Sequence, residues 1–128
     1  MTEQAINYYR LTINFNDQNI GLAQMFGALP ANAYILSIDA DVTTAFNAGT
    51  TNVVTIGTTK ANSNEIVASG ITAGTPGIYH LTTAAGLGLA VTTGTSPVTL
   101  FAKYAQTGTA ATAGAVTIII AFIPNNDL

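Results

Sequence analysis

The chain contains no cysteine and no tryptophan, and only 7% of its 128 residues are charged. Without cysteine, disulfide frameworks, thiolate zinc sites and thiol nucleophiles are excluded. Soluble domains typically carry about 25% charged residues. A surface with so few charges does little to oppose association with other surfaces. The first functional expectation is therefore that the chain associates with other protein chains.

The few charges do not favour nucleic acid or lipid as partners. The formal net charge is −3, and the three basic residues, Arg10, Lys60 and Lys103, are far apart in the sequence. No basic patch can therefore neutralise a run of phosphates. No apolar run approaches the 18 residues of a membrane span. The first residues lack the basic and apolar regions of a secretion signal, so we expect synthesis in the cytoplasm.

What the sequence does contain is threonine, glycine and β-branched residues, a mixture typical of strands and turns. A length of 128 residues suits one domain, over residues 1–128. Turn signals recur at a spacing of about ten residues, as in a β-sandwich or barrel. We therefore predict an all-β domain with nine candidate strands: Asn7 to Phe15, Gly21 to Leu29, Ala33 to Phe46, Asn52 to Thr59, Glu65 to Ser69, Gly77 to Thr82, Leu87 to Thr92, Val98 to Gln106 and Ala115 to Ile123.

Alternation of apolar residues predicts which face of each strand is buried. Ile119 and Ile123 lie on the face opposite to the inward row of their strand. A strand that is apolar on both faces lies between two layers or is covered by another subunit. The rows predicted from alternation are Tyr34, Leu36 and Ile38; Leu100, Ala102 and Tyr104; Val53, Val54 and Ile56; and Val116, Ile118, Ile120 and Phe122.

Two segments are less regular. Gly21 to Leu29 has apolar residues at helical spacing, but its two glycines and its β context favour a strand. Ala105 to Gly114 contains no bulky apolar residue, which predicts an exposed loop or hairpin tip.

The ionisable residues form weak catalytic patterns. His80 is the only histidine and lies in a strand pattern, and no G-x-S-x-G nucleophile motif accompanies it. Asp39 and Asp41 are two residues apart, so their carboxylates share one strand face and could serve a calcium ion or an acid–base pair. The residues that follow do not continue a calcium loop. We favour the interpretation that both carboxylates lie on the solvent side and deter edge pairing. We predict no catalytic, cofactor-binding or metal-binding residue, and no enzyme.

The candidate interface lies near the N-terminus and on the last strand. Tyr8, Tyr9 and Arg10 belong to residue types favoured at interfaces, and Ile119 and Ile123 supply the second apolar face. The alternative is that one of the two tyrosines points inward and the other lies at a rim. In the interface interpretation, residues 1–16 are an N-terminal arm or an interface strand.

A turn-and-strand signature extends over residues 35–81. It comprises Val42, Thr44, Ala45, Phe46, Asn47, Gly49 and Thr50, then Val54, Ile56 and Gly57, and later Gly77, Tyr79 and Leu81. This pattern, with the closing run Val98 to Ile123, resembles the small jelly-roll decoration (cement) proteins of tailed bacteriophage capsids. The likeness covers about residues 33–124 and carries no catalytic motif.

The resemblance implies an antiparallel β-sandwich of jelly-roll type with about eight or nine strands. It implies a virion structural protein that binds the outside of the major capsid protein shell, with itself as a second partner. A homotrimer, matching the local threefold positions of a capsid lattice, is expected ahead of a homodimer at twofolds. The alternative is a receptor- or carbohydrate-binding β-sandwich module of a phage tail or head fibre. That function needs exposed aromatic platforms, for which Tyr8, Tyr9 and Tyr104 are the candidates.

Overall fold

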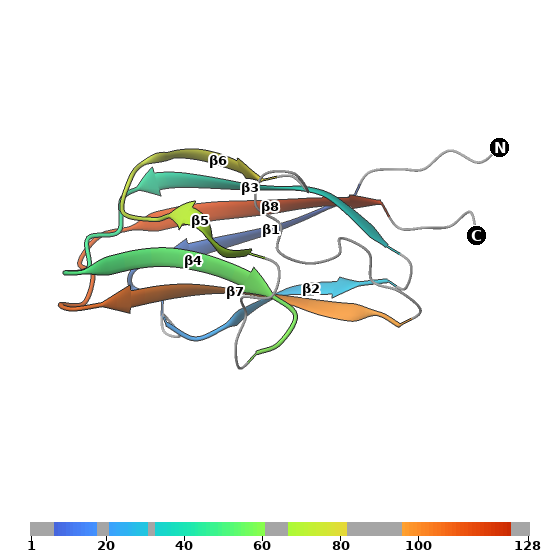
Figure 1. Ribbon diagram of the computed structural model, residues 1–128, viewed down its shortest axis with the longest axis horizontal. Helices are drawn as coiled ribbons and strands as arrows, with labels where there is room; N and C mark the ends of the chain where they lie inside the picture. Colours follow the sequence, from blue (N-terminus) through green and yellow to red (C-terminus); the bar gives the residue numbers. More distant parts are fainter. Residues whose placement is uncertain (1–6, 18–20, 31–32, 61–66, 82–95, 124–128) are drawn as a thin grey trace.

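The computed structural model describes residues 7–17, 21–30, 33–60, 67–81 and 96–123. All regular structure in these ranges is β, and no helix long and apolar enough to cross a membrane occurs in them. The strands are β1 (Asn7–Asn14), β2 (Gln24–Leu29), β3 (Tyr34–Thr44), β4 (Thr51–Gly57), β5 (Val67–Thr72), β6 (Gly77–Leu81), β7 (Val98–Thr107) and β8 (Ala115–Ile123) (Figure 1).

The eight strands form two four-stranded sheets that pack face to face. Sheet A has the order β1-β8-β3-β6 and sheet B the order β2-β7-β4-β5, and every neighbouring pair is antiparallel. Two such sheets, with long connections that cross from one sheet to the other, are the double-sheet jelly roll. The predicted all-β jelly-roll sandwich is confirmed. Each of its eight described strands overlaps a predicted one, although β5 extends three residues beyond the predicted end at Ser69.

The structure also describes the two less regular segments. The segment from Gly21 to Leu29 contains strand β2 and not a helix. Residues 108–114 form the connection between β7 and β8, as predicted, but residues 105–107, which the prediction placed in the same loop, belong to β7. The predicted strand from Leu87 to Thr92 lies outside the described residues.

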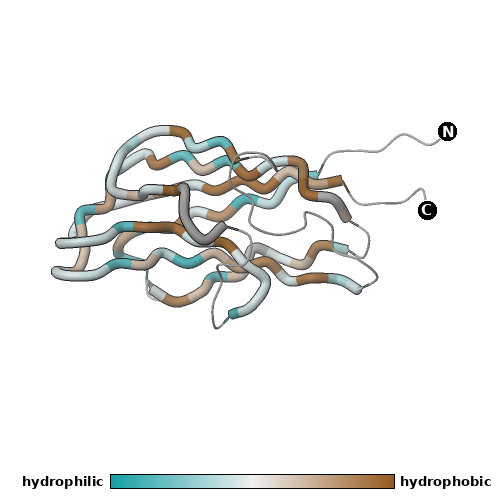
Figure 2. The backbone as a smooth tube through the Cα atoms, viewed as in Figure 1, coloured by the Kyte–Doolittle hydropathy of each residue, from teal (hydrophilic) through white to brown (hydrophobic). Residues whose placement is uncertain are grey.

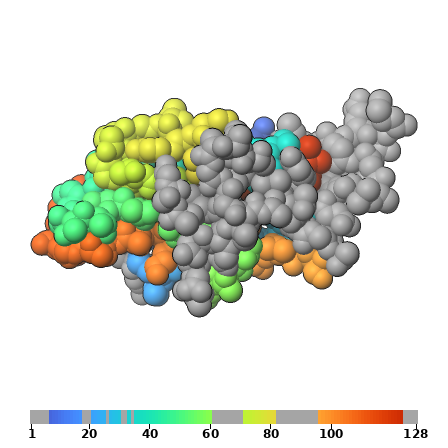
Figure 3. Space-filling model, viewed as in Figure 1, coloured from blue at the N-terminus to red at the C-terminus, as the bar shows by residue number. Residues whose placement is uncertain are grey.

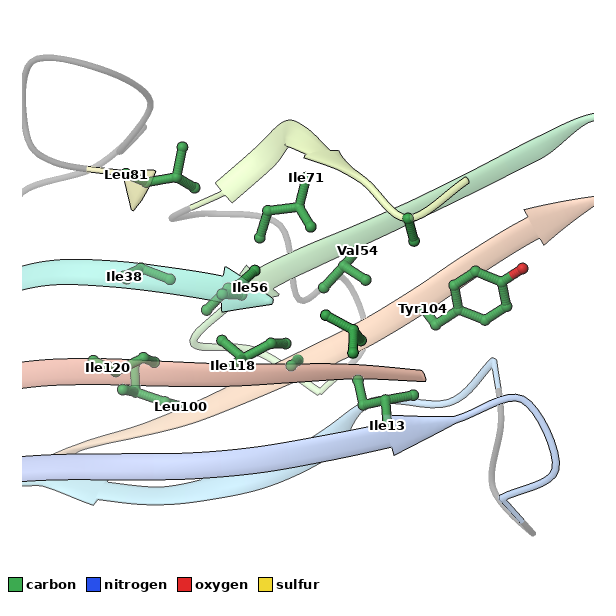
Figure 4. Close-up of a cluster of buried hydrophobic side chains, with 14 of the residues drawn as sticks. Ile13, Ile38, Val54, Ile56, Ile71, Leu81, Leu100, Tyr104, Ile118 and Ile120 are labelled. Carbon is green, nitrogen blue, oxygen red and sulfur yellow. The ribbon is translucent and has the colours of Figure 1, made fainter. Parts of the chain in front are cut away.

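The core lies between the two sheets. It includes the inward-facing side chains that were predicted for β7 and β8. Figure 4 shows these side chains meeting, and Figure 2 shows the hydrophobic stretches alternating along the strands that carry them. Each fully buried aliphatic side chain contributes roughly 1.5–3 kcal/mol. The largest fully buried side chains are Tyr104, Phe46, Ile13, Leu29, Ile38, Ile56, Ile71, Leu100, Ile118, Ile120, Val42 and Val54.

The predicted burial of β3 is wrong at its start. Ile35 and Ile38 are buried, whereas Leu36 is only partly buried. The register between β3 and β8 shifts between Ile35 and Ser37, so an extra residue is inserted at that point. Because a bulge of this kind puts two residues opposite one, it reverses the alternation on which the prediction depended.

The interpretation that Asp39 and Asp41 deter edge pairing is also wrong. Both residues lie on β3, which has β8 on one side and β6 on the other. They point to the solvent side of the sheet, as predicted, but from an inner strand. Because the backbone groups of an inner strand are already paired, these carboxylates protect no edge.

Tyr104 is a core residue and not the exposed aromatic platform that the alternative function needs. Its side chain is 1% exposed, and its ring packs against Phe46 with 4.2 Å between the ring centroids. Its hydroxyl donates to Asn52 Oδ1 at 2.5 Å. Asn52 in turn accepts from Ala48 N at 2.9 Å and donates to Ala48 O at 3.2 Å. This network satisfies a buried phenol and fixes the turn between β3 and β4.

Burial raises the pKa of the Tyr104 phenol above its ordinary value of 10.0. The folded chain therefore holds this proton more tightly than the unfolded chain. The resulting stability is fully present below about pH 10 and is lost as the pH rises through the pKa of the folded state.

We expect Tyr104→Phe to lower the free energy of unfolding by about 1 kcal/mol at pH 7, because one hydrogen bond is lost while Asn52 Oδ1 keeps its bond from Ala48 N. The variant should also lose less stability between pH 9 and 11 than the parent chain. Urea unfolding at a series of pH values measures both effects. Equal alkaline losses in the two proteins would contradict the assignment to Tyr104.

Candidate interaction surface

The outer face of sheet A brings together most of the ionisable side chains on the described strands. Strand register aligns Arg10 on β1 with Ile119 on β8, Ile119 with Asp39 on β3, and Asp39 with His80 on β6. Directly opposite residues in antiparallel strands share a face. One row across the sheet therefore carries a cation, an isoleucine, a carboxylate and an imidazole.

A second row lies beside the first. It runs from Thr12 through Thr117 and Asp41 to Ile78, and the hydroxyls of Thr12 and Thr117 are hydrogen-bonded at 3.1 Å. Small threonine side chains in the middle of the sheet leave the surface hollowed. The hollow has a volume of ≈ 410 Å³ and is lined by Arg10, Asp39, Asp41, Thr43, Ile78, Thr117 and Ile119.

One close pair of ionisable side chains borders the hollow. His80 Nδ1 is paired with Asp39 Oδ1, and the two side chains are 61% and 38% exposed. An exposed pair of this kind contributes little stability because water screens it. Among the described residues, no three His, Asp or Glu side chains gather closely enough to hold a metal ion.

The structure places four of the five predicted interface residues on the outer face of sheet A. Tyr8, Arg10 and Ile119 lie on the outer face of sheet A, where Tyr8 is 63% exposed and Ile119 is half-buried. Ile123 lies on the same face of β8, four residues beyond Ile119. Tyr9 lies on the opposite face of β1. The alternative of one inward and one outward tyrosine therefore describes this pair.

Tyr9 joins the two sheets. Its hydroxyl donates to Ala28 O on β2 at 2.5 Å, and its ring lies against Phe122 with 4.9 Å between centroids. A Cβ atom at Gly27 would approach the ring to 3.2 Å, so the absence of a side chain there makes room for it. Tyr9 thus fastens β1 to β2 along one flank of the sandwich.

Sequence reasoning missed three exposed apolar side chains. Ile78 on β6 is 75% exposed, Met25 on β2 is 64% exposed and Leu22 before β2 is 60% exposed. Figure 3 shows β6, coloured yellow, at an outer edge of the molecule. Alternation places Ile78 and His80 on one face of their strand. The burial of Leu81 and the partial burial of Tyr79 show that this face is the outer one.

The turn signature of the resemblance has a local structural role. Asn47 Oδ1 accepts from Thr112 N at 2.7 Å and from Ala113 N at 3.0 Å, and its amide donates to Thr112 Oγ1 at 2.9 Å. Gly49 N donates to Thr109 O at 2.8 Å. These bonds join the β3–β4 turn to the β7–β8 loop, so both loops are held rigidly at one end of the sandwich.

Chains from three solved phage capsid structures have an arrangement similar to this one. A chain of the cyanophage Pam1 capsid asymmetric unit matches with a TM-score of 0.66 and 17% identity, over 95% of this chain and 86% of that one. A chain of the Ralstonia phage GP4 capsid matches at 0.54 and 18%, over 98% and 86%. A chain of the acidic stable capsid of Helicobacter pylori bacteriophage KHP30 matches at 0.53 and 16%, over 98% and 95%.

At these identities the likeness establishes a shared jelly-roll fold. No family model and no curated protein sequence matches the chain. The alignments cover most of each matching capsid chain as well as most of this one, so those chains are not much larger than the fold itself.

Proposed function

We propose that this chain is a structural protein of a phage virion, and that it decorates the outside of the capsid. The observation that carries the proposal is the match of its whole jelly roll to chains from three phage capsid structures, over at least 86% of each of those chains. The sequence signature that resembles phage decoration proteins supports the same role independently.

The surface chemistry suits a permanent structural contact. Interfaces gain affinity from buried apolar side chains, and complementary charges beside these side chains fix the orientation of the partners. The outer face of sheet A places Ile119 at its middle, with Arg10 and Asp39 on either side. We propose that this face docks on the major capsid protein, with Tyr8, Ile78 and Ile123 at its borders. Its charges would set the orientation of docking, and its apolar side chains would supply the affinity.

The alternative, a receptor- or carbohydrate-binding module, has less support. Of its three candidate platforms, Tyr104 is buried in the core and Tyr9 is engaged with β2. Tyr8 alone stays exposed on the described strands, and a glycan site usually needs polar partners beside its aromatic platform.

The position of the protein can be tested on particles of the phage that encodes it. We expect antibodies against the purified chain to label intact capsids on their outer surface, as seen by immunogold electron microscopy. Particles from a phage lacking the gene serve as the control and should not be labelled. Label confined to the tail would support the receptor-binding alternative and contradict decoration, and label that appears only after capsids are opened would contradict the exterior position.

A further inference from the structure

Asp41 and Ile78 lie directly opposite each other, on β3 and β6, and both line the hollow on the outer face of sheet A. Asp41 is exposed, and no hydrogen bond or ion pair within the described part of the chain engages its carboxylate. Ile78 is 75% exposed. Long basic side chains lay their aliphatic stems along apolar surface and keep the cationic end at a polar group. An unpaired carboxylate beside an exposed isoleucine therefore suits a ligand of that kind.

The second carboxylate of the hollow is already engaged. Asp39 Oδ1 is paired with His80 Nδ1. Arg10 lies on β1, which is separated from β3 by β8, so its Cα is two strand spacings, about 10 Å, from that of Asp39. No ion pair joins Arg10 to either carboxylate. Asp41 is therefore the negative charge of this face that is open to a partner.

The polar groups around Asp41 are hydrogen-bond acceptors. Thr117 lies opposite Asp41 on β8, Thr43 lies two residues further along β3, and both threonines line the hollow. The Thr43 hydroxyl donates to Ala115 O at 3.4 Å, and Thr117 Oγ1 shares a hydrogen bond of 3.1 Å with Thr12 Oγ1. Because a hydroxyl oxygen has one proton and two lone pairs, both threonine oxygens can still accept a hydrogen bond. The hollow thus suits a ligand that is rich in N–H donors.

We propose that the hollow holds one arginine side chain of the major capsid protein, with the guanidinium group on Asp41 and the aliphatic stem on Ile78. A guanidinium has five N–H donors and no acceptor, so it can bond a carboxylate with two parallel N–H groups and still donate to the threonine oxygens. Arginine is also enriched at interfaces, whereas lysine is depleted. The inference rests on the proposed function for the identity of the partner, and it deepens that function by naming the side chain that the face receives.

The size of the hollow agrees with this occupant. Its volume of ≈ 410 Å³ lies near the lower end of the roughly 300–1,000 Å³ that ligand pockets span. A single long side chain fits such a volume. Ile119 lines the hollow as well, so the stem of the arginine would bring apolar contact to the middle of the docking face.

Asp41→Asn removes the charge and keeps the shape of the side chain. We expect this variant to bind capsids at least tenfold more weakly than the natural chain, because the guanidinium of the partner would lose its counter-charge. Co-sedimentation with particles from a phage lacking the gene measures the loss. Raising the salt concentration should weaken binding of the natural chain more steeply than binding of the variant, since salt screens an ion pair. A purely structural role of Asp41 would not change this salt dependence.

Asp17→Asn is the matched control. It makes the same change of charge beyond the end of β1, at a residue that does not line the hollow. Asp17 Oδ2 accepts from Asn14 N at 2.8 Å, and the amide oxygen of asparagine can accept the same bond. The control should therefore bind capsids as the natural chain does and show the same salt dependence.

A small probe tests the hollow without capsids. N-acetyl-arginine amide should shift the NMR resonances of Asp41, Ile78 and Thr117 in the natural chain, increasingly with its concentration. Its uncharged isostere, N-acetyl-citrulline amide, should leave them unchanged, and Asp41→Asn should respond to neither compound. N-acetyl-lysine amide should cause smaller shifts, because an ammonium group is more strongly hydrated than a guanidinium.

The two experiments separate this inference from the proposed function. No shift with the arginine probe, or larger shifts with the lysine probe, would overturn the assignment to arginine. Equal capsid binding by Asp41→Asn and the natural chain would also overturn it, and docking on the capsid would stand. If the natural chain did not bind capsids while the arginine probe still shifted the three resonances, the capsid protein would be overturned as the source of the arginine, and the hollow would be supported as its site.

Discussion

Gly114→Ala should lower the free energy of unfolding by about 4 kcal/mol, the combined cost of a strained backbone and an overpacked core. Gly114 precedes β8 and has a φ of +147°, which side chains other than glycine rarely adopt. A Cβ there would overlap the Phe46 ring and lie 2.8 Å from its Cε2. Phe46 is 1% exposed and already packs against Tyr104, so its ring has little space into which to move.

Gly77→Ala is the matched control for this substitution. Gly77 has nearly the same φ, +149°, but a Cβ at that position meets nothing within 4 Å. Gly77→Ala should therefore lower the free energy of unfolding only by the cost of the strained backbone, roughly 1–3 kcal/mol. Urea unfolding of both variants separates the two contributions. If Gly114→Ala were no worse than Gly77→Ala, the Phe46 ring would be free to shift, and the core at this end would be less tightly packed than its contacts indicate.

The strands could be predicted from the sequence because their signals are local. β8 and β7 each carry a buried residue at every second position, from Val116 to Phe122 and from Leu100 to Tyr104. Such alternation needs only that one sheet face is buried. Turn residues then limit each strand at both ends. The predicted and observed bounds of β8 are therefore identical.

The errors arose where distant parts of the chain decide the outcome. The bulge at Leu36 depends on how β3 pairs with β8, some eighty residues later in the sequence. The inner position of Asp39 and Asp41 depends on β6 lying beyond β3. Tyr104 fits the core because Asn52, on another strand, accepts a hydrogen bond from its hydroxyl group. None of these partners is visible in the local pattern.

Part of the candidate surface could also be predicted from the sequence. Residue types favoured at interfaces singled out Tyr8 and Arg10, and the second apolar face of the last strand singled out Ile119. That these three share one sheet face follows from the pairing of β1 with β8, which the sequence did not reveal. Ile78 joins the same hollow from β6, and only the strand order brings it there.

The two faces of β8 allow the same change at two adjacent positions to separate folding from docking. Ile118 is fully buried, and its neighbours across the sheet are Leu11 and Ala40. Ile118→Asp would bury a carboxylate without a partner at this position, which costs several kcal/mol, a large part of the 5–15 kcal/mol that stabilises a typical domain. We expect this variant to lose its β-sheet circular dichroism and to accumulate as aggregate.

Ile119→Asp places the same charge one residue further along the strand, on the outer face. Its neighbours across the sheet are Arg10 and Asp39, so attraction on one side offsets repulsion on the other. We expect a folded protein that has lost at least a tenfold factor in affinity for capsids, because a carboxylate would have to be desolvated at the centre of the docking face. Co-sedimentation with particles from a phage lacking the gene measures this loss, with the natural chain as reference. Unchanged binding would move the docking face away from sheet A, and the rigid loops that Asn47 joins would become the next surface to substitute.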